Sequence, residues 1–236
     1  MEYAASTDVG MRRHNNEDSY IVNVSGNDKI FIVADGMGGH NAGEIASLEA
    51  CRITESFVLE GKGNIDDVLR DGVVKANRDI YVRSCENDAM KGMGTTIDVC
   101  VIDGNKLHIA HVGDSRVYIV NNESIRRVTR DHSIVGMMLE EGSITEEEAR
   151  VHPQRNYITR AVGSSANIEV DIICEEIHSG EWVLMCTDGL TNMIEREVLH
   201  SVIKNSDSVD DAAEELVRRA KENGGDDNIT VILFRV

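Results

Sequence analysis

The sequence predicts an α+β fold in which antiparallel sheets are covered by helices on their outer sides. Most of the predicted strands follow one another through tight turns, as antiparallel neighbours do. Helical segments fall between groups of strands, with apolar residues at the spacing of one helical face. The 236 residues suffice for one domain with a substantial core, and no repeat or linker divides them.

Eight segments are predicted to be strands because they are short, rich in apolar residues and bounded by turn residues. Two pairs of them flank sequences typical of hairpin turns, Asp103-Gly104-Asn105 and Asn121-Asn122. The predicted strands are residues 29–34, 95–102, 106–112, 116–120, 124–128, 168–174, 181–186 and 228–236.

Four segments are predicted to be helical, and two of them begin with a recognisable capping sequence. Thr145 and Glu148 form a Thr-x-x-Glu capping box, which indicates the start of a short helix. Ser208 and Asp211 resemble such a box in front of a long apolar face. The predicted helices are residues 43–57, 65–80, a short segment that starts after residue 145, and 209–220.

The net charge of −18 excludes some classes of partner. An acidic surface repels nucleic-acid phosphates and anionic lipid, so we expect neither nucleic acid nor a membrane surface as a partner. No apolar run approaches the ~20 residues of a membrane span, and the first ten residues are too short and polar for a signal peptide. These features predict a cytoplasmic protein.

Five cysteines, an odd number, occur without any Cys-x-x-Cys spacing. This pattern favours buried apolar thiols in a reducing compartment over disulfides or a zinc site. The cysteines are Cys51, Cys85, Cys100, Cys174 and Cys186.

Five aspartates recur in similar settings: Asp35, Asp114 and Asp188 lie beside glycine, Asp227 opens the last predicted strand, and Asp18 follows Asn15-Asn16-Glu17. An aspartate in this setting can project into a cleft, and the neighbouring glycine exposes a backbone carbonyl. Hard cations such as Mg²⁺ and Mn²⁺ prefer these oxygen ligands, whereas carboxylates gathered without a cation repel one another. Any single Asp-Gly pair could be only a turn. The set, Asp18, Asp35, Asp114, Asp188 and Asp227, predicts a hydrolase with a metal-binding aspartate cluster.

Several other phosphate and hydrolase chemistries are excluded by missing motifs. No cysteine has an arginine six positions later, so the Cys-x5-Arg phosphatase nucleophile is absent. No Asp-x-Asp pair exists, which removes phosphoaspartate hydrolases and EF-hand calcium loops. A Walker phosphate loop and the Gly-x-Ser-x-Gly elbow are also absent.

The aspartates belong to longer motifs that together are specific for one family. They are Thr7-Asp8-Val9-Gly10, Arg13 with Asn15-Asn16-Glu17-Asp18, Asp35-Gly36-Met37-Gly38-Gly39-His40, Gly92-Met93-Gly94-Thr95-Thr96, His111-Val112-Gly113-Asp114-Ser115-Arg116, Asp131-His132-Ser133, His152-Pro153-Gln154-Arg155-Asn156 with Thr159-Arg160, Thr187-Asp188-Gly189-Leu190 and Asp227-Asn228-Ile229-Thr230. In these motifs, and over nearly its whole length, the chain resembles the metal-dependent protein phosphatases of the 2C type, in particular the compact bacterial serine/threonine phosphatases.

The resemblance implies two antiparallel sheets stacked as a sandwich, helix pairs outside them, and metal ions at one edge. It implies a single catalytic domain over residues 1–236, with a mobile flap at about 136–161. The implied reaction is hydrolysis of phosphoserine and phosphothreonine in proteins through attack by a metal-bridging water or hydroxide. The implied cofactors are Mn²⁺ or Mg²⁺, with two core ions and a weaker third. The implied partners are phosphorylated proteins and an opposing serine/threonine kinase, and the implied state is a monomer.

The resemblance also implies a role for each matching site residue. Asp35 is expected to bridge two metals, and Arg13 to bind phosphate; with Asp188 they are the expected catalytic residues. The Gly36 carbonyl, Asp188 and Asp227 are expected to complete one metal site. Asp18, supported by Glu17, is expected at the other metal, and Asp114 at the third, shared with Asp188.

The proton donor to the leaving group is not carried over. Animal members of the family place a histidine where this chain has Met37, which cannot donate a proton. His40 is an alternative three residues later, and a metal-bound water is the preferred interpretation.

Two rival functions make different predictions. A pseudophosphatase that binds partners without catalysis would have lost metal ligands, and none is lost here. Another metal-dependent hydrolase acting on small phosphoesters would favour a nucleotide over a phosphopeptide.

Overall fold

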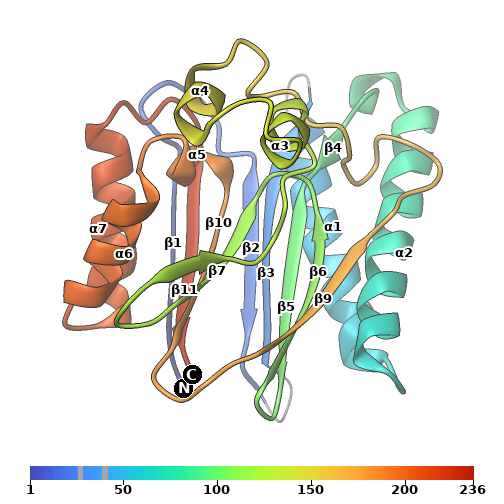
Figure 1. Ribbon diagram of the computed structural model, residues 1–236. Helices are drawn as coiled ribbons and strands as arrows, with labels where there is room; N and C mark the ends of the chain where they lie inside the picture. Colours follow the sequence, from blue (N-terminus) through green and yellow to red (C-terminus); the bar gives the residue numbers. More distant parts are fainter. Residues whose placement is uncertain (26–28, 39–41) are drawn as a thin grey trace.

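Two antiparallel sheets stack face to face, and helices cover their outer sides (Figure 1). The computed structural model describes residues 1–25, 29–38 and 42–236. The first sheet has the strand order β1-β11-β10-β7-β8, with bounds β1 Glu2–Asp8, β7 Arg116–Val120, β8 Ile125–Arg127, β10 Trp182–Cys186 and β11 Ile229–Arg235. The second has the order β2-β3-β5-β6-β9, with β4 paired to β3, and bounds β2 Asp18–Asn23, β3 Lys29–Met37, β4 Gly94–Thr95, β5 Ile97–Asp103, β6 Lys106–Val112 and β9 Asp171–Glu176.

The helices form an outer layer on each side and a group at one edge (Figure 1). Helices α1 (Ala42–Glu60) and α2 (Ile65–Glu86) cover the second sheet, and α6 (Arg196–Asn205) and α7 (Val209–Glu222) cover the first. The edge group comprises α3 (Ile134–Glu140), α4 (Glu146–Val151) and α5 (Asp188–Thr191). A short 3-10 helix, η1 (Asp88–Met90), follows α2. The predicted α+β sandwich is therefore confirmed.

Strand β3 shows how the sequence builds three apolar layers. Its side chains alternate between two buried faces, as strand geometry requires. Phe31 and Val33 face the other sheet, where Phe31 stacks on Phe234 of β11 with ring centroids 4.0 Å apart. Ile30 and Ile32 face α1 and α2. The third apolar layer lies between the first sheet and helices α6 and α7.

Both predicted hairpins are present. Asp103 pairs with Lys106 across a two-residue turn in which Gly104 has a φ of +59°, a conformation that glycine adopts without strain. The second hairpin joins β7 and β8, and it is closed by the Asn121 amide donating to the Ser124 carbonyl at 3.0 Å. The capping box at Thr145 and Glu148 is also formed, and it begins α4.

Some elements escaped prediction, and one expectation was wrong. Strands β1 and β2 lie at sheet edges, so they carry too many polar side chains to stand out as apolar runs. Helices α3, α5 and α6 were also not predicted. All five cysteines are free, but Cys85 and Cys174 are exposed, which contradicts the expectation of buried thiols. Within the described residues, no helix is long and apolar enough to cross a membrane.

Candidate metal centre

The sheet topology brings the five predicted aspartates to one edge of the sandwich. Asp18 begins β2 and lies directly opposite Asp35 on β3. Asp188 begins α5, two residues beyond the end of β10, and Asp227 lies shortly before the start of β11. Asp114 lies in the turn between β6 and β7, which belong to different sheets. The edge is the one where α5 lies in Figure 1.

Asp18 is held between the two sheets by hydroxyl groups. Its Oδ2 accepts hydrogen bonds from Thr230 Oγ1 at 2.6 Å and Thr187 Oγ1 at 3.0 Å. These threonines belong to the strand ends of the first sheet, while Asp18 belongs to the second. Both oxygens are therefore fixed in direction, although only Oδ2 has a partner among the described residues.

Burial and mutual repulsion disfavour the charged form of these carboxyl groups. Burial raises the pKa of Asp18 to about 7, helped by Asp188 and Asp227 and opposed by its two hydroxyl partners. Burial also raises the pKa of Asp35 well above its usual range, and Asp18, Asp188 and Asp114 raise it further. The pKa values of Asp114 and Asp188 are raised for the same reasons. Such a cluster is stable in its charged form only with a counter-charge.

Two buried carboxylate oxygens at this edge indicate that the site suits a cation. Asp18 Oδ1 and Asp188 Oδ1 have no hydrogen-bond partner among the described residues. Unsatisfied buried acceptors are rare, and a divalent cation with oxygen ligands would satisfy them. In the part of the chain that is described, no three acidic, histidine or cysteine side chains are set as ligands of one ion. Carbonyl and water oxygens would therefore have to complete each coordination shell.

Glycine is required at Gly36 because the backbone there is closely packed. A Cβ atom would come within 2.2 Å of the Gly43 carbonyl oxygen and 2.4 Å of the Glu17 carbonyl oxygen. The Gly36 amide donates to that Glu17 oxygen at 3.2 Å. The carboxyl group of Glu17 lies against Gly43 in the first turn of α1, and burial raises its pKa although Arg13 lowers it.

Arg13 reaches the cluster from a loop that Asn228 holds in place. The Asn228 amide nitrogen donates to the carbonyls of Val9 and Asn15, and its oxygen accepts from the Glu17 amide at 2.8 Å. The guanidinium of Arg13 pairs with Asp227 Oδ2 at 2.7 Å while half of the side chain remains exposed. Burial lowers the pKa of Arg13, but Asp227 and nearby acidic groups raise it overall.

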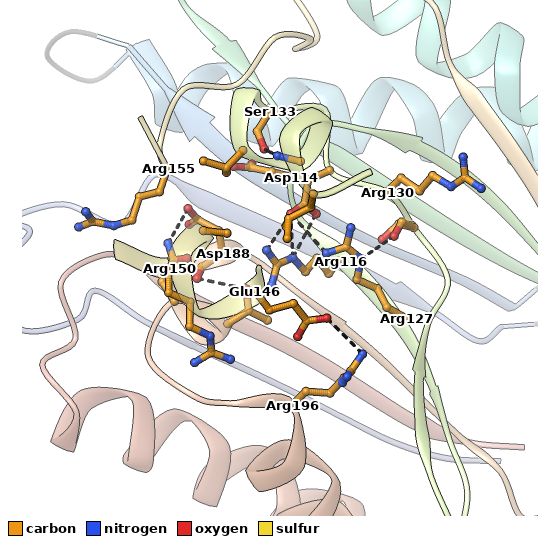
Figure 2. A pocket seen from close by; sticks show the side chains of 18 of the residues that line it. Asp114, Arg116, Arg127, Arg130, Ser133, Glu146, Arg150, Arg155, Asp188 and Arg196 are labelled. Atoms are coloured by element: carbon orange, nitrogen blue, oxygen red, sulfur yellow. Dashed lines mark hydrogen bonds and ion pairs between the residues drawn. The ribbon is translucent and has the colours of Figure 1, made fainter. Parts of the chain in front are cut away.

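Two cavities adjoin the aspartate edge. The larger, about 650 Å³, is bordered by Asp114 and Asp188 on one side and by α3 and α4 on the other (Figure 2). The smaller, about 410 Å³, is bordered by Arg13 and Asp227 and, from the predicted flap, by Arg150, Val151, Arg155 and Asn156. The predicted flap, residues 136–161, therefore supplies walls to both cavities.

His111 and His132, from two of the matching motifs, act as structural hydrogen-bonding groups. His111 Nε2 donates to the Arg130 carbonyl at 2.7 Å, and its Nδ1 shares a hydrogen bond with Asp98 Oδ1 at 2.5 Å. His132 Nδ1 accepts from the Gly113 amide at 3.1 Å, and its ring lies 4.6 Å from that of His111. Met37 ends β3, but His40 lies outside the described residues, so the question of the proton donor stays open.

Four residues that position the site received no role in the sequence analysis. They are Thr187, Thr230 and Asn228, whose contacts are given above, and Asn192, which donates to Asp188 Oδ2 at 2.9 Å. Three of them flank the aspartates in the matching motifs, and this adjacency is the signal that would have identified them. Asn192 lies one helical turn after Asp188, which is the spacing of neighbours on a helix face.

Comparison with known proteins places the chain in a family. A family model described as Protein phosphatase 2C matches residues 5–229. The chain is 40% identical over 241 residues to protein phosphatase PhpP of Streptococcus pneumoniae serotype 2, covering 99% of this chain and 96% of that protein.

Solved structures extend the likeness to the fold. Serine/threonine phosphatase Stp1 from Staphylococcus aureus is 32% identical with a TM-score of 0.93, covering all of this chain and 94% of that one. The catalytic domain of serine threonine protein phosphatase PstP, solved in complex with two manganese ions, is 32% identical with a TM-score of 0.88, covering 98% and 96%. From its sequence and its fold, the chain belongs to the protein phosphatase 2C family of serine/threonine phosphatases.

Proposed function

We propose that this chain hydrolyses phosphoserine and phosphothreonine in proteins with two divalent cations held at the aspartate edge. The observation that carries this proposal is a pair of buried oxygens, Asp18 Oδ1 and Asp188 Oδ1, that have no hydrogen-bond partner among the described residues. They lie within a cluster of carboxyl groups that oppose one another's ionisation. A related phosphatase of the same fold was solved with two manganese ions, which supports the number of core cations.

The assignment of ligands follows from the positions of the side chains. We assign Asp35 to both cations because it lies opposite Asp18 on the neighbouring strand and close enough to Asp188, at the start of α5, for the two charges to interact. Asp188, Asp227 and the Gly36 carbonyl would hold one cation together with Asp35. Since no three such side chains are set around one ion among the described residues, these carboxylates would have to draw closer together when the cation binds. Asp18, supported by Glu17, would hold the other. When bound, Mn²⁺ or Mg²⁺ would supply an activated water nucleophile and offset charge on the phosphoryl oxygens.

The protein itself contributes orientation and a phosphate clamp. Arg13 can fork two hydrogen bonds to phosphoryl oxygens, and its contact with Asp227 fixes its direction. The threonines around Asp18 and the asparagine beside Asp188 keep the carboxylates in place, so their oxygens need not reorganise when substrate binds. No side-chain nucleophile is required for this reaction.

We propose a third, weaker cation at Asp114, shared with Asp188. Both carboxyl groups border the larger cavity, and the charge of Asp188 raises the pKa of Asp114. Replacement of Asp114 by alanine should lower turnover and leave two cations tightly bound. Loss of all metal in this variant, measured by elemental analysis after dialysis, would place Asp114 with the core ligands instead.

The biological setting is also part of the proposal. A phosphatase of this specificity reverses the product of a serine/threonine kinase, so we propose such a kinase as its counterpart. Free thiols, three of them buried in apolar surroundings, are typical of a reducing compartment and support a cytoplasmic location. A single catalytic domain over residues 1–236 that works as a monomer remains our expectation.

Phosphate release from phosphothreonine peptides, with and without added Mn²⁺, tests the function. We expect turnover only with the metal, and a higher kcat/KM for the phosphopeptide than for a nucleotide. A preference for the nucleotide would favour a small-phosphoester hydrolase. Binding of phosphopeptide without any turnover at saturating Mn²⁺ would favour a pseudophosphatase. Parallel titration with Mg²⁺ would show which cation supports turnover at the lower concentration.

A further inference from the structure

The two cavities beside the aspartate edge concentrate one type of side chain. Six arginines border the larger cavity and Arg13 borders the smaller one, so seven of the chain's 24 lysine and arginine residues lie here. The net charge of the chain is −18, and most of its surface therefore repels anions. The cavity walls are a local exception on an acidic protein.

Most of these arginines already have carboxylate partners within the fold. The pairs are Arg116 and Arg127 with Asp131, Arg130 with Glu140, and Arg196 with Glu146. Arg116 and Arg127 both pair with the buried carboxylate of Asp131 and neutralise its charge. The four paired arginines form part of the wall of the larger cavity.

Arg130 and Arg196 form ion pairs as long and exposed as that of Arg150, at 3.5 and 3.6 Å. Of the six arginines, however, only Arg150 and Arg155 also border the smaller cavity. Within the described residues, Arg150 forms one ion pair, with Glu195 at 3.7 Å, and that glutamate is 69% exposed. Arg155 forms no ion pair with the residues that the structure describes. A solvent-exposed ion pair at such a distance contributes little free energy, so both guanidinium groups are available to a ligand.

The position of these two arginines links them to the candidate metal centre. Both come from the segment predicted as a flap, and both border the larger and the smaller cavity. Figure 2 shows them beside Asp188, on the side of the cavity away from Arg127 and Arg130. The smaller cavity is also bordered by Arg13, which we assign to the phosphoryl group that is hydrolysed.

We propose that Arg150 and Arg155 form a second anion-binding subsite, which selects substrate segments that carry another carboxylate or phosphoryl group near the phosphorylated residue. This inference rests on the proposed phosphatase function and names its preferred substrates. Guanidinium groups bind both kinds of anion through paired hydrogen bonds, which favours arginine over lysine in this role. Because the rest of the surface is acidic and repels anions, we expect the preference for anionic substrate segments to depend on Arg150 and Arg155.

Peptide kinetics can test the subsite. Phosphothreonine peptides would be identical except for flanking glutamates, flanking glutamines or one added phosphoserine. With Mn²⁺, kcat/KM of the wild type should be about tenfold higher for the glutamate peptide than for the glutamine peptide. The double variant Arg150→Ala, Arg155→Ala should lose this ratio. Arg126→Ala removes the same charge from an exposed position on β8 that borders neither cavity, and this variant should keep the ratio.

Charge reversal and direct binding complete the design. Arg150→Glu with Arg155→Glu should reverse the preference toward a lysine-flanked peptide. Fluorescence anisotropy of unphosphorylated peptides gives Kd values that do not depend on turnover. A wild-type enzyme that binds and hydrolyses the glutamate and glutamine peptides equally would overturn the subsite, as would an equal loss on all substrates. Failure to release phosphate from any substrate would instead count against the phosphatase function. The phosphoserine peptide shows whether a phosphoryl group serves as well as carboxylates.

Discussion

Two sets of buried carboxyl groups border the same cavity and differ in their partners. Burial raises the pKa of Asp131, but Arg116 and Arg127 lower it more, so it lies below its usual value. Asp114 and Asp188 face the same cavity, and their pKa values are raised by burial and by neighbouring carboxylates. Asp131 is neutralised by arginines of the chain itself, whereas Asp114 and Asp188 need a positive charge from a bound cation.

This difference separates a structural cluster from a functional one. Carboxylates that are paired inside the fold stabilise it at neutral pH, because unfolding would release them to a state in which they bind protons more readily. Carboxylates that repel one another destabilise the metal-free fold and gain stability when a cation binds. Sites kept for function often have such a stability cost.

The largest effect is expected on activity at the open cluster. Asp35→Asn and Asp188→Asn should each lower phosphate release by roughly 10³-fold at saturating Mn²⁺, because the cations lose an anionic ligand. The metal-free variants should melt at a higher temperature than the metal-free wild type, since one repelling charge is gone. Turnover above about a tenth of wild type in both variants would remove these residues from the core of the site.

The paired cluster should respond in the opposite direction. Asp131→Asn leaves Arg116 without its main counter-charge, so the free energy of unfolding should fall by about 3 kcal/mol. Urea denaturation with and without Mn²⁺ would measure this loss. Glu175→Gln, which breaks the exposed pair with Arg126, is the control and should change stability by less than about 1 kcal/mol. Equal losses in the two variants would contradict the structural role of Asp131.

Arg13 is a cation within the open cluster, and its replacement should give an intermediate effect. Arg13→Ala should lower kcat/KM for p-nitrophenyl phosphate by about tenfold and weaken inhibition by inorganic phosphate. Arg12 is the matched control, because it pairs with exposed Asp226 at 3.6 Å and its side chain is 74% exposed. Arg13→Lys should restore part of the loss. Small and equal effects at both positions would show that Arg13 is an ordinary surface residue.

Much of this arrangement could be predicted from sequence because it depends on short-range patterns. The hairpins at Gly104 and Asn121 and the capping box at Thr145 are encoded by adjacent residues, and all three formed as expected. Three of the aspartates, Asp35, Asp114 and Asp188, could be chosen because they lie beside glycine, and Asp18 and Asp227 because they lie in the matching motifs. Their convergence on one edge was implied by the family resemblance and depends on the topology of both sheets.

Other features depend on long-range contacts that no local pattern records. Asn228 holds a loop that is more than 200 residues away in sequence, and Asp18 is fixed by threonines of the opposite sheet. Edge strands β1 and β2 have half-exposed, polar side chains, so periodicity did not reveal them. The exposure of Cys85 and Cys174 likewise depends on which face of their elements the fold covers.

The smallest expected effect is a pH dependence of stability at His132. Burial, His111 and Arg160 lower the pKa of His132 to about 4, although Asp171 opposes them. Between pH 6.5 and 4 the unfolded chain therefore binds a proton that the folded protein does not, so stability falls as the pH falls. From pH 7 to pH 5.5 this loss should be about 1 kcal/mol in the wild type and absent in His132→Asn. Carboxyl groups with raised pKa, such as Asp18, have the opposite pH dependence, but both proteins share it. The difference between the two denaturation series in EDTA thus isolates His132. Parallel pH profiles for wild type and variant would show that folding does not lower the pKa of His132.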